Sequence, residues 1–425
     1  MLLHWILAVN KNIKRSSILW NAIGGAANAC QSAIILIFVS HKLGIVTAGI
    51  VTIAYAVANL FMTMGKYGMR NYQVTDVNCK FSFGDYFYSR LIINIVVIIM
   101  AVLYLALCLE TGRYSNFKIC VIFEVIILKI IDGFEDVYIG RYQQVGRLDA
   151  GAKIMAMRLI LSTVLMCILI VCGLGIHIAL MGGIISSVLM DIYFIKGTFY
   201  FTKEKAGDIC KNNILQLIKT CFPLCVGTTL SVYIGNAPKY MIDNYMNEEI
   251  QAIFGYIMMP VFVIMLLNNF IYQPMVKELG DLWEARDYET FKAKNIRQCL
   301  MVVLLMVFVL LAGITVGLPI LSWMYNSDLT KYRLEFAVLL IGGGFYALAF
   351  YLNVPITTIR KHKYIAIGYA IAALLSFIAG KYFAVKWGIL GAAYLYLLIN
   401  VFLVGIYTCV LIVGIKKEIL KNNLG

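Results

Sequence analysis

Twelve apolar stretches constrain what this chain can fold into more than any other feature of the sequence. As helices, each is long enough to cross roughly 30 Å of hydrocarbon at about 1.5 Å per residue. They fall at residues 16–40, 44–65, 88–109, 117–140, 153–173, 175–197, 214–236, 250–273, 299–321, 333–355, 364–384 and 388–413. Hydrophobic residues make up 62% of the chain and charged residues only 14%. A soluble domain carries about 25% charged residues. The sequence therefore predicts an all-α polytopic membrane protein with twelve transmembrane helices.

The distribution of cations predicts how those helices are oriented. A net charge of +14 would suit a nucleic-acid partner in a soluble protein, but in a membrane protein Lys and Arg gather in cytoplasmic loops. With the N-terminus inside, the inner segments and the inner ends of the stretches hold 27 of the 36 Lys and Arg residues and the outer loops hold 8, while Lys129, deep within the fourth stretch, is counted with neither side. We therefore expect a multi-pass protein of the plasma (inner) membrane with both termini cytoplasmic and no nucleic-acid partner.

The two halves of the sequence resemble each other weakly. An Asp-Tyr pair precedes the third stretch at Asp85 and the ninth stretch at Asp287, an offset of 202 residues. Six crossings return a chain to its starting side, so repeats at this offset are parallel, which is typical of transporters. We expect two six-helix lobes, an N-terminal one at 1–205 and a C-terminal one at 206–425.

The fourth stretch holds charges that should not face lipid. Its ionisable residues are Glu124, Lys129, Asp132, Glu135 and Asp136. At about 100° per residue, Lys129, Asp132 and Asp136 share one helix face, so the lysine can neutralise one acid but not all. Arg158 and Asp191 are expected at a similar depth in the next two stretches. A charge at the centre of a span costs about 2.5–3.5 kcal/mol on insertion scales. Two interpretations stay open: ion pairs that lock helices together, or a cavity whose acids bind cations or protons.

Three further charged residues are candidates for binding. Arg70 lies in an aromatic-rich inner loop, at 70–90. Lys239 and Asp243 are spaced i, i+4 in a segment expected to face outward, and they suit either sugar and phosphate recognition or a bare helix end. The segment 274–297 places Met275, Leu279, Leu282 and Phe291 near one stripe, which predicts an amphipathic helix along the inner interface.

No enzyme motif appears in the sequence. There is no Walker loop, HExxH or GxSxG motif, and the eleven cysteines and four histidines show no metal-ligand spacing. The outer loops are short, whereas a membrane glycosyltransferase or polymerase usually carries its acid or base on a larger outer loop. We expect no catalytic residue, no metal and no cofactor, and keep a membrane-embedded glycan polymerase as the alternative from another class.

Several segments nevertheless resemble one known family. They are YGMRNYQVTD from Tyr67, DGFEDVYIGRYQQVGRLDAGAK from Asp132, SVYIGNAPKYMIDNY from Ser231, QAIFGYIMMPVFVIMLLNNFIYQPMVKEL from Gln251 and DLWEARDYETF from Asp281. With the twelve spans, they are similar to bacterial polysaccharide flippases of the multidrug/oligosaccharidyl-lipid/polysaccharide exporter (MOP) superfamily, whose fold is MATE-like. The resemblance covers nearly the whole chain, through diffuse motifs.

The resemblance implies a function and its partners. A flippase of this family moves a polyprenyl-diphosphate-linked oligosaccharide from the inner to the outer leaflet by alternating access, for surface polysaccharide synthesis. The partners implied are that lipid-linked substrate, membrane lipids and polysaccharide-assembly proteins. The family often places cations in its central cavity, but here the first, second and eighth stretches carry only polar residues such as Asn28, Gln31 and Asn268.

Candidate residues for substrate binding or coupling are Arg70, Lys129, Asp132, Asp136, Arg158, Asp191, Lys239 and Asp243. Of these, Arg70, Lys129, Arg158 and Lys239 are candidates for the diphosphate anchor. The acids suit coupling to a proton or sodium gradient. They therefore suit equally well a cation-coupled multidrug exporter of the same superfamily.

The orientation is testable at the expected outer segment 236–250. A single cysteine introduced as Asn247→Cys, in a background without native cysteines, should react with a membrane-impermeant thiol reagent in intact cells, because the cation distribution places this segment outside. Labelling that requires cell lysis would reverse the orientation.

Overall fold

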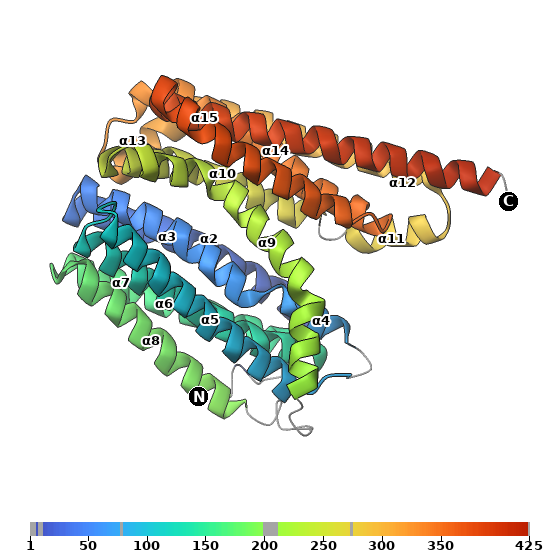
Figure 1. The fold of residues 1–425 in the computed structure, drawn as a ribbon, viewed down its shortest axis with the longest axis horizontal. Helices are drawn as coiled ribbons and strands as arrows, with labels where there is room; N and C mark the ends of the chain where they lie inside the picture. The colour runs from blue at the N-terminus through green and yellow to red at the C-terminus, as the bar shows by residue number, and fades with distance from the viewer. Residues whose placement is uncertain (1–5, 7–11, 77–79, 199–210, 273–274, 424–425) are drawn as a thin grey trace. The chain divides into compact units, whose positions relative to one another are not determined.

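The computed structural model describes residues 6, 12–76, 80–198, 211–272 and 275–423, and its regular elements there are helices (Figure 1). In the first half they are α2 (Ile13–Leu43), α3 (Ile45–Lys66), α4 (Met69–Thr75), α5 (Phe83–Glu110), α6 (Asn116–Gln144), α7 (Leu148–Val171) and α8 (Gly175–Gly197). In the second half they are α9 (Lys211–Tyr245), α10 (Glu248–Tyr272), α11 (Met275–Glu284), α12 (Tyr288–Ala312), the short π-helix η2 (Gly313–Gly317), α13 (Leu318–Tyr325), the short 3₁₀-helix η3 (Thr330–Tyr332), α14 (Arg333–Thr358) and α15 (Lys363–Asn423).

Twelve crossings account for these helices. Among the described residues, ten helical stretches are long and apolar enough to span a membrane, and one of them runs from α12 through α13. The helix α6 has 29 residues but is excluded from those ten because it carries too many charges. The stretch 363–420 contains two helices that meet at a non-helical residue, Gly388. Adding α6 and dividing α15 gives the twelve spans that the sequence predicts, so the all-α polytopic fold is confirmed.

The chain forms two compact units, residues 1–232 and 233–425. In unit 1, α2 packs on α7 and α3 packs on α6, while α6 also contacts α4, α5, α7 and α8. In unit 2, α14 contacts α10, α12 and α15. The predicted lobe boundary between residues 205 and 206 lies outside the described residues, so it stays a prediction.

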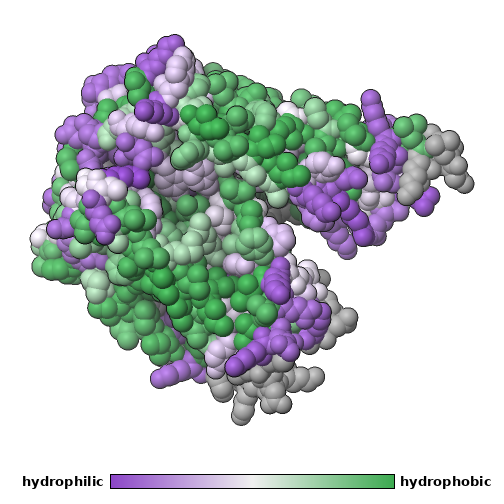
Figure 2. Space-filling model, in the orientation of Figure 1, coloured by the Kyte–Doolittle hydropathy of each residue, from purple (hydrophilic) through white to green (hydrophobic). Residues whose placement is uncertain are grey.

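The surface of the helices agrees with a bilayer environment. Green, hydrophobic residues cover the middle of the helices in the view of Figure 2, and purple, hydrophilic ones gather toward their ends. Many large apolar side chains are exposed along α5, including Ile99, Leu103 and Leu107 at 54–61%. Lipid is the solvent that suits such a surface, because hydrocarbon solvates apolar side chains and water does not.

One expectation about the inner interface is wrong. The segment predicted as a single amphipathic helix divides at Arg286, whose φ of 60° is left-handed. Asp287 then begins α12 by accepting a hydrogen bond from the Thr290 backbone N–H at 3.1 Å. Phe291 therefore belongs to α12 rather than to the stripe of α11, and position 274 lies outside the described residues. What remains amphipathic is α11, which buries Leu279 fully among charged neighbours.

Glycine permits two of the breaks between spans. Gly44 separates α2 from α3 with φ 85° and ψ 168°, and Gly388 divides α15 with φ 56° and ψ −131°. Side chains with a Cβ rarely adopt these conformations, so each position needs glycine for conformational reasons. A Cβ at either position would meet no atom within 4 Å.

A substitution at Gly388 should therefore measure the free-energy cost of the backbone conformation alone, because the added side chain meets no other atom. Gly388→Ala is expected to lose about 1–3 kcal/mol of stability and to lower the melting temperature in detergent. The matched control is Gly405→Ala in the same helical stretch, where an added Cβ also meets open space and alanine favours a helix by about 0.5–1 kcal/mol. Equal melting temperatures for the two variants would contradict the assigned conformation.

Candidate functional site

The candidate site is built on α6, which lies at the centre of unit 1. The Ser115 side chain caps the helix by accepting from the Lys118 backbone N–H at 3.3 Å. At the other end, the Arg147 N–H donates to the Tyr142 carbonyl at 2.7 Å, past a left-handed Gly146. Between these caps, contacts with α3, α5, α7 and α8 bury the charged positions of the helix. Packing on several sides therefore keeps its charges out of lipid.

Arg158 on α7 binds three carboxylates from two other helices. Its Nη2 lies 2.6 Å from Asp132 Oδ1 and 2.7 Å from Glu135 Oε2, both on α6. Its Nε lies 3.2 Å from the same Glu135 oxygen and 3.5 Å from Asp191 Oδ1 on α8. All four residues are buried. One guanidinium therefore holds α6, α7 and α8 together through charge-assisted contacts.

Lys129 adds a second cation to this set. Its ammonium donates to Asn28 Oδ1 at 2.9 Å and to Gln31 Oε1 at 2.8 Å on α2, and it lies 3.3 Å from Asp132 Oδ2. The ring of Tyr55 on α3 lies 5.8 Å from the same nitrogen. These contacts bring α2 into the site. We call Lys129, Asp132, Glu135, Arg158 and Asp191 the α6 cluster; with all groups ionised, it holds two cations and three anions.

Asp136 belongs to a separate set of charges. Its Oδ2 lies 2.6 Å from Arg90 Nη2 on α5, and its Oδ1 lies 3.6 Å from Arg70 Nη1 on α4. Arg90 is 1% exposed and also donates to the Gly65 carbonyl at 3.0 Å, while Arg70 donates to Gln143 at 3.0 Å. Both oxygens of Asp136 thus face a guanidinium, and this set ties α5 and α4 to α6.

Glu124 pairs with neither set. Both of its oxygens lie 3.0 Å from His177 Nδ1 on α8, and the Phe117 ring makes a T-shaped contact with that imidazole, with the ring centres 5.0 Å apart. The His177 side chain is 40% exposed. This contact joins α6 to α8 nearer the start of both helices.

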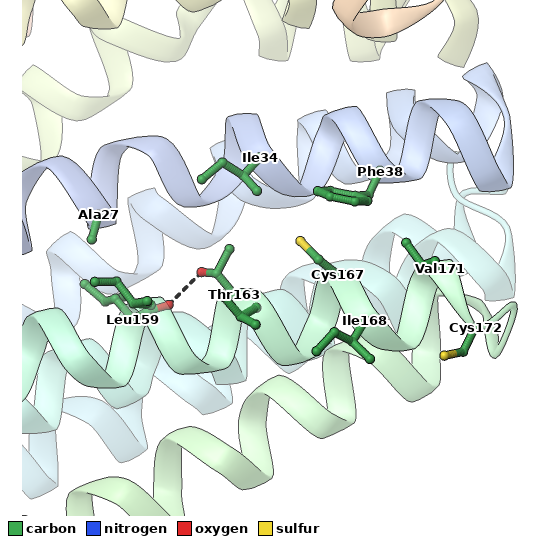
Figure 3. A pocket seen from close by; sticks show the side chains of 11 residues that line it. Ala27, Ile34, Phe38, Leu159, Thr163, Cys167, Ile168, Val171 and Cys172 are labelled. Carbon is green, nitrogen blue, oxygen red and sulfur yellow. Dashed lines mark hydrogen bonds between the residues drawn. The ribbon is translucent and has the colours of Figure 1, made fainter.

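An apolar groove lies beside the α6 cluster, between α2 and α7. It encloses about 440 Å³, and its lining side chains, among them Ile34, Phe38 and Cys167, point into the space between the two helices (Figure 3). Thr163, whose hydroxyl donates to the Leu159 carbonyl at 2.7 Å, is a polar residue in this lining. Its oxygen also accepts from Gln31 at 3.2 Å, and Gln31 accepts from Lys129. A short chain of hydrogen bonds therefore connects the groove to the α6 cluster.

The remaining predicted residues lie in unit 2. Lys239 on α9 is 5% exposed, and its ammonium lies 5.1 Å from the centre of the Phe262 ring on α10. Among the described residues it forms no ion pair, so the i, i+4 spacing does not produce a pair with Asp243. Within the part of the chain that the structure describes, Lys239 is therefore a buried cation of unit 2 without a carboxylate in ion-pair range.

The structure brings some of the residues predicted from the sequence together and separates others. Lys129 does meet one acid on its own helix, Asp132, whereas Asp136 faces Arg90 and Arg70 instead. The candidates omit Glu135 and Arg90. An acid three residues after Asp132, and an arginine inside the third apolar stretch, are the signals that could have found them.

Comparisons with solved structures place this arrangement in a known fold. An inward-facing multidrug resistance MATE family transporter of the MOP superfamily matches with a TM-score of 0.66 and 14% identity over 93% of this chain and 96% of that chain. A MOP superfamily transporter from Pyrococcus furiosus, described as having a binding pocket of reverse polarity, matches with a TM-score of 0.63 and 14% identity, covering 98% and 97%. A Vibrio cholerae MATE transporter variant matches with a TM-score of 0.63 and 12% identity, covering 97% and 98%. The chain therefore has the MATE transporter fold.

No protein-family model and no curated protein sequence matches the chain. The likeness to these transporters consequently rests on structure.

The Arg90–Asp136 pair should behave as structural scaffold. Arg90→Gln should cost about 3–5 kcal/mol of stability, because it leaves Asp136 buried with only the partly exposed Arg70. Adding Asp136→Asn should recover most of that loss, measured as melting temperature and membrane-inserted yield. Lys292→Gln, which breaks an exposed pair with Glu289, is the control and should change little. A double variant no more stable than Arg90→Gln would argue against the pairing.

Proposed function

We propose that this protein is a flippase that moves a polyprenyl-diphosphate-linked oligosaccharide from the inner to the outer leaflet of the plasma membrane by alternating access. The MATE fold supports a transporter, and the twelve spans and the 27:8 distribution of cations support an integral protein with cytoplasmic termini. The substrate assignment rests on a separate observation in unit 2.

That observation is the unbalanced charge of Lys239. A buried ammonium is costly unless an anion or several hydrogen bonds compensate it. Among the described residues, the one electrostatic contact of the Lys239 ammonium is a cation–π contact with the face of the Phe262 ring. A diphosphate would supply the missing negative charge, whereas an organic cation would be repelled. Lys239 is therefore proposed as the diphosphate anchor, and Asp243, one turn further along α9, is proposed to contact the substrate too.

The α6 cluster is proposed to couple transport to an ion gradient. Its three carboxylates exceed its two cations, so it favours uptake of a positive charge. No ATP-binding motif appears in the sequence, and a cation gradient would provide the free energy instead.

A cation-coupled multidrug exporter is the second candidate. The specific observation in its favour is the anionic excess of the α6 cluster, which suits a cationic drug as well as a coupling ion. Solved transporters of similar fold include ones described as multidrug resistance proteins. The two candidates differ in the charge of their substrate, so Lys239 separates them.

The test compares Lys239→Gln and Lys239→Arg with Lys42→Gln, an exposed lysine at the end of α2. In a strain whose surface polysaccharide requires this protein, Lys239→Gln should insert at the normal level and lose at least tenfold in polysaccharide export. Lys239→Arg should retain part of the export because it keeps the charge. Lys42→Gln should export normally.

Two results would overturn the proposal. Full polysaccharide export by Lys239→Gln at an equal protein level would show that Lys239 is not the diphosphate anchor. Unchanged polysaccharide on deletion of the gene, with increased sensitivity to cationic drugs, would favour the exporter.

A further inference from the structure

Two oxygens of the α6 cluster lack a hydrogen-bond donor. Glu135 Oε1 and Asp191 Oδ1 are buried and have no hydrogen-bond partner among the described residues, although Arg158 lies 3.5 Å from the second oxygen. Glu135 is 4% exposed and Asp191 is 8% exposed. One turn before Asp191 on α8, the fully buried hydroxyl of Ser187 also has no hydrogen-bond partner within the described part of the chain. A buried acceptor without a donor costs about 1–3 kcal/mol, and more when it is charged.

The charges around these oxygens do not compensate them. Arg158 faces both carboxylates from α7 but also binds Asp132, which in turn faces Lys129. Lys66 at the end of α3, and Tyr138 and Tyr142 on α6, are further titratable groups in electrostatic range of the pair. The two carboxylates lie on either side of one atom, because Arg158 Nε is 3.2 Å from Glu135 Oε2 and 3.5 Å from Asp191 Oδ1. The negative charge of Glu135 therefore disfavours the anionic form of Asp191. Two carboxylates close together in a dry site titrate as a unit.

We propose that Glu135 and Asp191 form a proton-binding site that holds a single proton between them. Protonation makes one carboxyl neutral and turns one of its oxygens into an O–H donor. An otherwise unpaired oxygen of the other carboxyl can then accept a hydrogen bond from this O–H. The α6 cluster then has two cations and two anions. Acid pairs that share a proton are a known solution to this kind of crowding.

A proton fits this site better than a metal cation. A metal ion must replace its hydration shell with several oxygens. Among the residues that the structure describes, this site offers one unpartnered oxygen each from Glu135, Asp191 and Ser187, and the Arg158 guanidinium repels a second cation nearby. A proton needs one donor oxygen and one acceptor. This inference rests on the proposed coupling role of the α6 cluster and names protons as the coupling ion.

The experiment observes the protonated carboxyl directly. Infrared spectra of the purified, membrane-reconstituted protein without substrate should show a protonated-carboxyl C=O band at neutral pH that shifts in heavy water. Glu135→Gln and Asp191→Asn should each remove this band, because the remaining carboxyl then ionises against Arg158. Glu110→Gln, which removes an exposed carboxyl at the end of α5, is the matched control and should keep the band. Replacing potassium with sodium at fixed pH should leave the band unchanged.

Several outcomes would overturn the proton site. They are a wild-type spectrum without the band, a band that survives both substitutions, or a band that sodium displaces. The wild-type measurements remain decisive if a variant folds poorly. The band requires no substrate, so a failure of the flippase proposal leaves it intact. Conversely, polysaccharide export without the band would reject the proton site alone.

Discussion

The contact of Arg158 with three carboxylates is the interaction on which unit 1 depends. Without it, α6 would carry Asp132 and Glu135 into the membrane with only Lys129 to neutralise them. Moving one unpaired ion into a low-dielectric interior costs several kcal/mol even after relaxation. The spanning position of α6 therefore requires α7 and α8 beside it, because they supply the arginine and the third acid. Its enclosure by other helices follows from its charges as much as from its apolar residues.

The two units handle buried charge in different ways. Unit 1 concentrates acids and bases in contact, with one more acid than base in the α6 cluster. Unit 2 buries Lys239, which forms no ion pair among the described residues and lies against an aromatic ring. An excess of acid favours the uptake of cations, and a solitary ammonium favours anions. A transporter that exchanges a coupling cation for a phosphorylated lipid would need sites of both kinds, and this difference in charge is the basis of the proposed division of roles.

Sequence patterns predicted the fold better than the partners of each charge. Several features depend only on local composition and can therefore be read directly from the sequence. They are the lengths of the apolar stretches, the number of charged residues in α6 and the even number of crossings. Partner choice depends on how helices distant in sequence approach: Asp136 lies on the Lys129 face of an ideal helix, yet it meets Arg90, 46 residues away. Likewise, a helical stripe extrapolated through Arg286 could not foresee the left-handed turn that ends α11.

Buried ion pairs are seldom the most stable solution, since well-packed apolar residues in their place are often neutral or stabilising by about 1–4 kcal/mol. Stability alone therefore does not explain why unit 1 holds so many charges. The two sets of charges in unit 1 differ in how completely their carboxylate oxygens are paired. Asp136 has a guanidinium at each oxygen, as a structural tie requires. Glu135 and Asp191 each keep an oxygen that no described residue reaches with a hydrogen bond, so the α6 cluster has the capacity to gain a proton and lose it again. For this reason we assign coupling to the α6 cluster. We assign a structural role to the separate set formed by Asp136, Arg90 and Arg70.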